Sequence, residues 1–172
     1  MGKKEIVIMK NKRVITYGTF DLFHIGHLNL FKKLKKIGDY LIVGVSTDEF
    51  NAIKGKKAFF PFKQRFEIIK NITYVDLVIP ETSWEQKKDD IKKYKVDIFA
   101  IGNDWEGRFD FLKQYCEVMY LPRTRKISSS DVRNILDSIN DFNEIISTFR
   151  KVDLSQIKKL LFLLEQLKKD LK

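Results

Sequence analysis

The sequence predicts an α/β fold: a doubly wound, five-stranded parallel sheet followed by a helical extension at the C-terminal end. Near-continuous apolar runs of strand length, most clearly at 40–46 and 96–102, are typical of strands that are buried on both faces. Amphipathic segments at helical spacing separate these runs, so strands and helices alternate along the chain. The 172 residues are enough for one domain with a sizeable core.

The individual elements are expected in a regular order. Gly38 is a C-cap signal for the first helix, and Pro61 suits the first turn of the second. Pro80 stops the third strand, and Ser128 can cap the last helix of the domain. We expect strands at about 12–18, 40–46, 74–80, 96–102 and 116–121, and helices at about 24–37, 61–72, 84–94, 109–115 and 128–139, with a possible further strand at 6–9.

The domain is expected to span residues 1–139, and residues 140–172 form the extension. Leu154, Ile157 and Leu161 begin a series of apolar residues at three- and four-residue steps, which predicts an amphipathic helix. Three occupants of its apolar face remain open: the domain itself, a second subunit, or a membrane surface.

Composition narrows the function classes. The net charge is +10, but the excess lies largely in residues 1–13 and 151–172. The sequence also lacks the stripe of alternating basic and aromatic residues that would indicate nucleic-acid binding. Cys116 is the single cysteine, which excludes an intramolecular disulfide. No apolar run approaches the ~20 residues needed to cross a membrane, and the first residues lack the apolar core of a signal peptide. We expect a cytoplasmic protein.

The most informative stretch is 16–27, which joins the first strand to the first helix. Such a turn offers free backbone N–H groups and the positive end of a helix dipole to an anion. Gly18 and Gly26 permit close backbone approach. His24 and His27 are i, i+3 neighbours, so both can point to one side of the helix start. The pattern predicts a phosphate-binding turn.

Three further segments follow strands, at 54–57, 102–105 and 123–129. Ligands of parallel sheets bind outside the carboxyl ends of the strands, so these segments are expected to meet the turn at 16–27. Each also has a structural alternative: a solvated basic loop at 54–57, a tight turn at 102–105, and simple N-capping by Ser128. Asp21 is either a cap or a ligand that helps to hold Mg²⁺ on a triphosphate.

The His-x-Gly-His signature resembles that of the nucleotidyltransferase superfamily, which has a Rossmann-like fold. Longer motifs narrow the resemblance to bacterial glycerol-3-phosphate cytidylyltransferases over about residues 12–135. These motifs include Tyr-Gly-Thr-Phe-Asp-Leu-Phe-His-Ile-Gly-His, Trp-Glu-Gln-Lys-Lys, Gly-Asn-Asp-Trp-Glu-Gly-Arg-Phe-Asp and Tyr-Leu-Pro-Arg-Thr.

The resemblance implies transfer of a cytidylyl group from CTP to sn-glycerol 3-phosphate, giving CDP-glycerol and pyrophosphate for teichoic-acid-like polymers. It also implies Mg²⁺ dependence and a homodimer. Two alternatives remain open: a cytidylyltransferase for another small phosphate, such as phosphocholine, phosphoethanolamine or a polyol phosphate, and a nucleotide-binding module without catalysis.

The resemblance also implies roles at matching positions. Lys54 and Lys87 would bind the acceptor phosphate. Catalytic roles would fall to His24, His27, Lys56 and Arg123. The nucleotide would be bound by Thr19, Phe20, His24, Gly26, His27, Lys56, Arg65, Asp104, Trp105, Arg123, Thr124, Ile127, Ser128 and Ser129.

Overall fold

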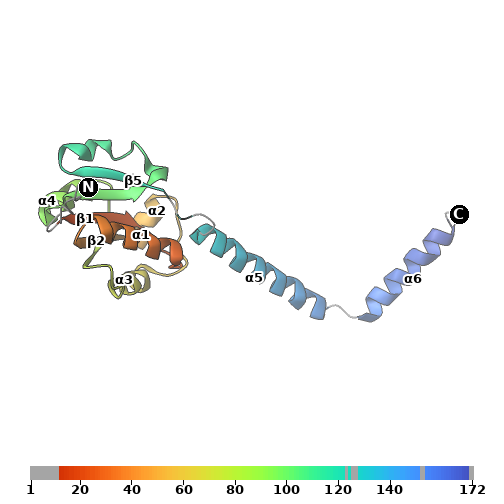
Figure 1. Ribbon diagram of the computed structural model, residues 1–172. Coiled ribbons are helices and arrows are strands. Elements are labelled where there is room, and N and C mark those ends of the chain that lie inside the picture. The colour runs from red at the N-terminus through yellow and green to blue at the C-terminus, as the bar shows by residue number, and fades with distance from the viewer. Residues whose placement is uncertain (1–11, 123, 125–127, 152–153, 171–172) are drawn as a thin grey trace, which may run out of the picture. The chain divides into compact units, whose positions relative to one another are not determined.

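The computed structural model describes residues 12–122, 124, 128–151 and 154–170. These residues form a five-stranded, all-parallel sheet in the order β3-β2-β1-β4-β5, so the expected fold class is confirmed (Figure 1). The possible strand at 6–9 lies outside the described residues. The strands are β1 (Arg13–Gly18), β2 (Tyr40–Ser46), β3 (Leu77–Glu81), β4 (Ile98–Gly102) and β5 (Glu117–Leu121).

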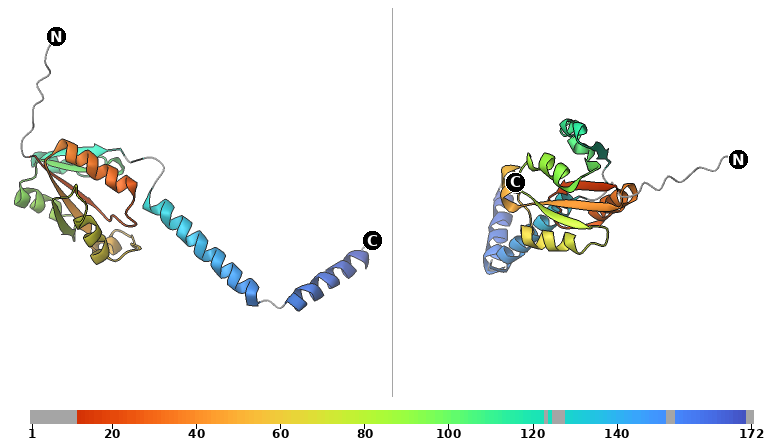
Figure 2. Two further views of the ribbon diagram at one scale, coloured as in Figure 1. Left: turned by 60° about the horizontal axis from the view of Figure 1, so that its bottom comes forward. Right: turned by 90° about the vertical axis from the view of Figure 1, so that its left-hand side faces the viewer.

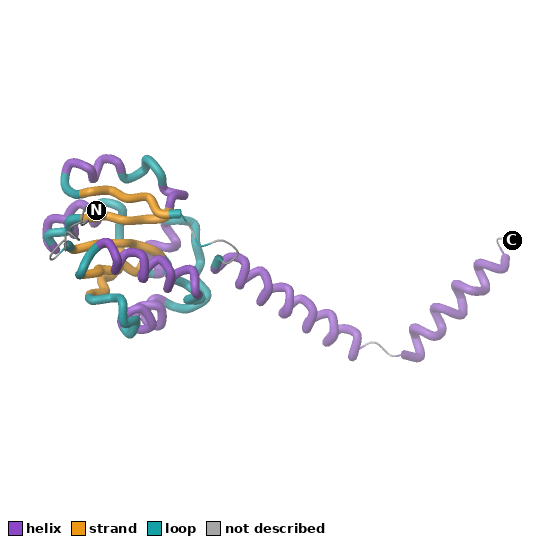
Figure 3. Tube along the Cα trace, viewed as in Figure 1, coloured by secondary structure: helices purple, strands orange, loops and turns teal. Residues whose placement is uncertain are grey.

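Helices connect successive strands in the pattern expected from the sequence (Figure 3). The third strand begins at Leu77 instead of residue 74, because Tyr74 and Val75 lie in a turn and pack against the core. The connecting helices are α1 (Ile25–Ile37), α2 (Asp48–Ile53), α3 (Phe62–Lys70), α4 (Gln86–Tyr94) and the 3₁₀ helices η1 (Asn103–Trp105) and η2 (Asp110–Gln114).

The sheet has an apolar cluster on each face. Val14 belongs to a cluster with Phe31 of α1 and Ile69 of α3, whereas its neighbour Ile15 belongs to a cluster with Ile91 of α4. Adjacent strand residues point to opposite faces, so this division places α1 and α3 on one face and α4 on the other. Figure 2 shows the two helical layers around the sheet.

The order in which strands are added to the sheet reverses at β1, which pairs with β2 on one side and with β4 on the other. This is the point at which open parallel sheets bind their ligands, beyond the carboxyl ends of the strands. Strands β1, β2, β3 and β4 end at Gly18, Ser46, Glu81 and Gly102, respectively. A site at this edge of the sheet can therefore be built around these four residues.

The chain divides into two compact units, Met1–Ser129 and Ser130–Lys172. Helix α5 (Ser129–Lys151) runs through residue 139, where a helix end was expected, because no glycine or proline interrupts residues 129–151. Helix α6 (Leu154–Asp170) confirms the expected amphipathic helix in the extension. Among the described residues, no helix combines the length and apolarity that a membrane crossing requires.

Candidate active site

His24 caps helix α1 with its own side chain. Its backbone is extended (φ −135°, ψ 174°), and its Nδ1 accepts the N–H of Gly26 at 3.0 Å. In a neutral imidazole this bond leaves the hydrogen on Nε2, which makes Nε2 a donor. The rings of His24 and His27 stack with centroids 4.0 Å apart. The two histidines therefore lie together at the helix start, as their spacing predicts.

Phe20 supports this pair from the core side. Its ring is 6% exposed and lies 5.4 Å from the His27 ring and 5.2 Å from Phe31. Its backbone has a positive φ of 50°, which turns the ring back over Gly18, where an added Cβ would come within 3.0 Å of it. A contact between Phe20 and CTP would thus involve its backbone, because its side chain is packed in the core.

Arg65 connects several loops beneath the site. The residue is 1% exposed, and its guanidinium donates to the carbonyls of Thr19 (2.7 Å), Ser46 (2.8 Å) and Phe60 (2.9 Å), and to Asp48 (2.7 Å). Burial favours a higher pKa for Asp48, but hydrogen bonds from the Phe62 N–H and from Arg65 lower this pKa below its usual value. The geometry gives Arg65 a positioning role in the loops that follow β1 and β2.

Thr19 and Asp21 fix the same loop through further contacts. Thr19 Oγ1 donates to Oδ1 of buried Asn51 at 2.8 Å. The Asp21 carboxylate is 3% exposed and accepts the backbone N–H groups of Phe59 (2.6 Å) and Phe60 (3.0 Å). Asp21 thus accepts backbone N–H groups, as the capping interpretation of this residue predicts. In the described part of the chain, no cluster of three or more His, Cys, Asp and Glu side chains could hold a metal ion, so an Mg²⁺ site at Asp21 remains a prediction.

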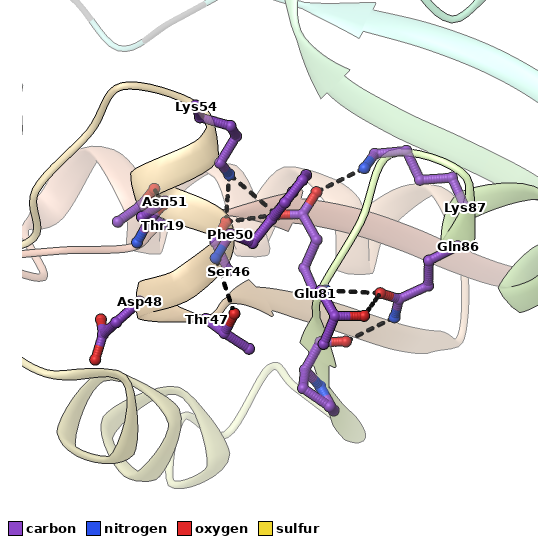
Figure 4. A network of polar contacts seen from close by, with 12 residues as sticks. Thr19, Ser46, Thr47, Asp48, Phe50, Asn51, Lys54, Glu81, Gln86 and Lys87 are labelled. Atoms are coloured by element: carbon purple, nitrogen blue, oxygen red, sulfur yellow. Dashed lines mark hydrogen bonds and ion pairs between the residues drawn. The ribbon is translucent and has the colours of Figure 1, made fainter.

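The two expected acceptor lysines meet at a buried carboxylate that sequence reasoning missed (Figure 4). Lys87 Nζ lies 2.6 Å from Glu81 Oε1, and Lys54 Nζ lies 3.3 Å from Glu81 Oε2. Ser46 Oγ donates to Glu81 Oε2 at 2.5 Å and accepts from Lys54 at 2.7 Å. Lys54 and Lys87 come from different helices, so Glu81 is the group that joins them.

Aromatic rings surround the Lys87 ammonium. Its Nζ lies 4.7 Å from the centroid of Tyr17, 4.9 Å from Trp84, and 5.6 Å from both Phe50 and Phe109. Cations are attracted to the faces of aromatic rings, which partly offsets the loss of water around this charge. Burial raises the pKa of Tyr17, and its 2.9 Å hydrogen bond to Asp90 acts in the same direction. Tyr17 therefore stays neutral beside the cluster.

Burial also lowers the pKa of Lys54 below the ordinary lysine value. Glu81 opposes this effect, while the nearby charges of Lys56 and Lys87 add to it. The Glu81 carboxylate thus favours the charged form of Lys54, against the effect of burial. Lys56 itself is exposed, with Nζ 5.8 Å from the ring centroid of Trp105.

The remaining expected site residues lie on the loops after β4 and β5. Asp104 is exposed on η1, next to Trp105, whose ring centroid lies 5.5 Å from that of Trp84. Thr124 and Ser128 are half-buried, and Ser129 Oγ donates to the Asp21 carbonyl at 2.7 Å, which brings Ser129 to the turn after β1. The expected residues Arg123 and Ile127 lie outside the described residues.

Residues 15–135 match the family model described as cytidylyltransferase-like. The chain belongs to this family. The chain is also similar to two glycerol-3-phosphate cytidylyltransferases. That of Staphylococcus aureus is 56% identical over 125 residues, which is 73% of this chain and 95% of the relative. That of Bacillus subtilis is 57% identical over 122 residues, which is 71% of this chain and 95% of the relative. The resemblance identified from the motifs is confirmed.

A solved structure supports the same assignment of the fold. The lipopolysaccharide core biosynthesis protein from Thermoplasma volcanium superimposes with a TM-score of 0.59 at 26% identity, covering 66% of this chain and 98% of that one. For this cytidylyltransferase, the residues beyond 135 lie outside the family match, so the family accounts for the sheet and its loops and leaves most of α5 and all of α6 unexplained.

Proposed function

We propose that this cytidylyltransferase transfers a cytidylyl group from CTP to sn-glycerol 3-phosphate, giving CDP-glycerol and pyrophosphate. The observation that carries the proposal is the high identity to glycerol-3-phosphate cytidylyltransferases over almost their whole length. The matched region includes the stacked histidine pair and the Lys54–Glu81–Lys87 cluster. The residues proposed for catalysis at the start of α1 and for acceptor binding thus fall within the shared part of the chain.

The reaction is an in-line displacement at the α-phosphorus of CTP. A phosphate oxygen of the acceptor forms the new P–O bond, the bond from the α-phosphorus to the bridging oxygen of the β-phosphate breaks, and pyrophosphate leaves with that electron pair. The acceptor phosphate is already ionised, so no protein nucleophile is needed. Positioning and donors aimed at developing negative charge supply the catalysis.

The chain offers such donors from several elements. His24 and His27, at the start of α1, would donate to oxygens of the reacting phosphates. Lys56 and Arg123 would hold the triphosphate, and Lys54, together with Lys87, would hold the acceptor phosphate. Mg²⁺ would arrive with CTP and neutralise part of the triphosphate charge, since this ion binds through phosphate oxygens with few protein ligands.

The cellular setting forms part of the proposal. CDP-glycerol is an activated glycerol phosphate, so the reaction class that consumes it is glycerol-phosphate transfer to a growing polymer such as a teichoic acid. We place the enzyme in the cytoplasm as a homodimer, as the family resemblance implies. Sedimentation of the full chain, at several concentrations, tests the dimer.

The test is pyrophosphate release with CTP and Mg²⁺ across a panel of acceptors. The Lys54, Lys87 and Glu81 charges sum to a net positive site, which favours glycerol 3-phosphate and disfavours phosphocholine and phosphoethanolamine, because both carry a cation. One repulsive charge contact at about 4 Å corresponds to about 1 kcal/mol in bulk water and about 4 kcal/mol near a protein surface, so we expect at least about fivefold preference. Preferred turnover of phosphocholine would show that glycerol 3-phosphate is not the acceptor. No turnover with any acceptor would indicate a nucleotide-binding module without catalysis.

A further inference from the structure

Glu81 is the buried carboxylate between the two lysines that are proposed to bind the acceptor. We propose that Glu81 is a positioning residue: it holds the ammonium groups of Lys54 and Lys87 in place for the acceptor phosphate, without touching the acceptor itself. This inference rests on the proposed function, because it assigns the acceptor to these lysines.

The backbone of Glu81 is held in a fixed position. Glu81 ends β3, and its register partner on β2 is Ser46, the last residue of that strand. Its carbonyl accepts the N–H of Thr47 at 2.9 Å, which continues the ladder past the strand end. Its side chain is 3% exposed. The carboxylate is therefore carried by a hydrogen-bonded residue of the sheet and not by a loop.

The lysines, in contrast, come from two separate helices. Lys54 is the C-cap residue of α2, and Lys87 is the second residue of α4. Both side chains are long and unbranched, so ordering them costs side-chain entropy unless a fixed partner holds them. Glu81 binds one ammonium with each carboxylate oxygen, and Ser46 bridges Lys54 to the same carboxylate (Figure 4). The carboxylate thus sets the separation of the two cations.

The described hydrogen bonds do not use every N–H of the two ammonium groups, although both side chains are buried, 8% exposed for Lys54 and 1% for Lys87. An ammonium has three N–H donors. Lys54 gives two of them to Ser46 and Glu81, and Lys87 gives one to Glu81. The cluster has two positive charges and one negative charge, so an arriving phosphate dianion meets a net attraction. Glu81 would repel that dianion at contact, which is why its contribution is indirect.

Other titratable groups lie around the Lys54–Glu81–Lys87 cluster. Neutral Tyr17 lies on β1, Lys56 follows α2, and Asp90 lies on α4 next to Tyr17. Without the carboxylate, Lys54 and Lys87 would be two like charges in an enclosure walled by aromatic rings. Desolvation and repulsion would then favour loss of a proton from Lys54, and with it loss of acceptor binding.

The experiment compares Glu81→Gln with Glu85→Gln, which removes the same charge from an exposed neighbouring position. For Glu81→Gln we expect the KM for glycerol 3-phosphate to rise by about 10- to 100-fold, the effect of losing charged hydrogen bonds, with the KM for CTP nearly unchanged. The alkaline limb of kcat/KM for the acceptor should also move to lower pH. Glu85→Gln should behave as the wild type.

Equal losses toward CTP and acceptor, or an unchanged acceptor KM and pH profile in the folded variant, would overturn the proposal. If Glu81→Gln does not fold, Glu81→Asp and Ser46→Ala decide: both should raise the acceptor KM selectively, and an unchanged KM in both contradicts the positioning role. Calorimetric binding of glycerol 3-phosphate gives the same comparison without turnover. Failure of the wild type to bind or use this acceptor would instead refute the proposed function.

Discussion

Replacing Arg65 by methionine isolates the role of the guanidinium, because the volume of the buried side chain is largely kept. The change removes four hydrogen bonds. The carbonyls of Thr19 and Ser46 would each lose a donor, at about 1–3 kcal/mol apiece, and the contacts to Phe60 and half-exposed Asp48 would add less. We therefore expect a loss of about 3–6 kcal/mol, a large part of the ~5–15 kcal/mol that keeps a typical domain folded.

Urea unfolding followed by tryptophan fluorescence measures this loss, since both tryptophans of the chain, Trp84 and Trp105, belong to the folded domain. With a slope of about 2 kcal/mol per molar urea, the midpoint of Arg65→Met should fall by roughly 1.5–3 M. Lys63→Gln, an exposed charge on the same helix, should leave it unchanged. A variant that unfolds at the wild-type midpoint but no longer binds CTP would refute the positioning role and favour direct contact with the nucleotide.

Three further predictions follow from the site. His24→Ala and His24→Asn should both lose at least about 100-fold in turnover, but only the alanine variant should also lose the helix cap, about 1 kcal/mol in thermal or urea unfolding; equal stability of the two would contradict the capping role. Gly44→Ala places a Cβ 2.1 Å from the Tyr17 ring and should cost about 1–3 kcal/mol, whereas unchanged stability would show that the ring moves freely. Burial lowers the pKa of Lys54, so its positive charge is lost at a pH below the usual lysine value of about 10.4. The kcat/KM for the acceptor should therefore fall at a lower pH than it would for an ordinary lysine, and Lys54→Arg, which stays charged, should abolish this fall; an unchanged pH profile in Lys54→Arg would contradict the assignment to Lys54.

The sheet could be predicted from the sequence because its central strands, β1, β2 and β4, are almost entirely buried. The run at 40–46 contains almost only apolar residues, and β2 occupies those positions. Tyr74 and Val75 misled the prediction of the third strand, because aromatic and β-branched residues favour strands but here fill the core from a turn. The turn ends at Asp76, whose carboxylate accepts the N–H of Leu41 at 2.6 Å, a long-range contact that no local pattern reveals.

The candidate site was predictable where spacing defines geometry and unpredictable where tertiary packing does. The pairing of His24 and His27 follows from their helical spacing, and their rings do stack. The deep burial of Arg65, Asp21 and the Phe20 ring depends on loops distant in sequence. Glu81 was missed because an acidic residue after a strand is usually solvated; its position at a strand end, between two expected phosphate-binding lysines in sequence, was the available signal.

The cap formed by His24 has an evolutionary consequence. A relative that no longer catalysed the reaction would still need a hydrogen-bond acceptor at the start of α1, and Asp, Asn, Ser or Thr supply one. Position 24 should then drift within this small set of capping residues, whereas position 27 would remain constrained by packing against Phe20 and Phe23. A capping residue at 24 together with an apolar residue at 27 would therefore mark descendants that kept the fold and abandoned the chemistry.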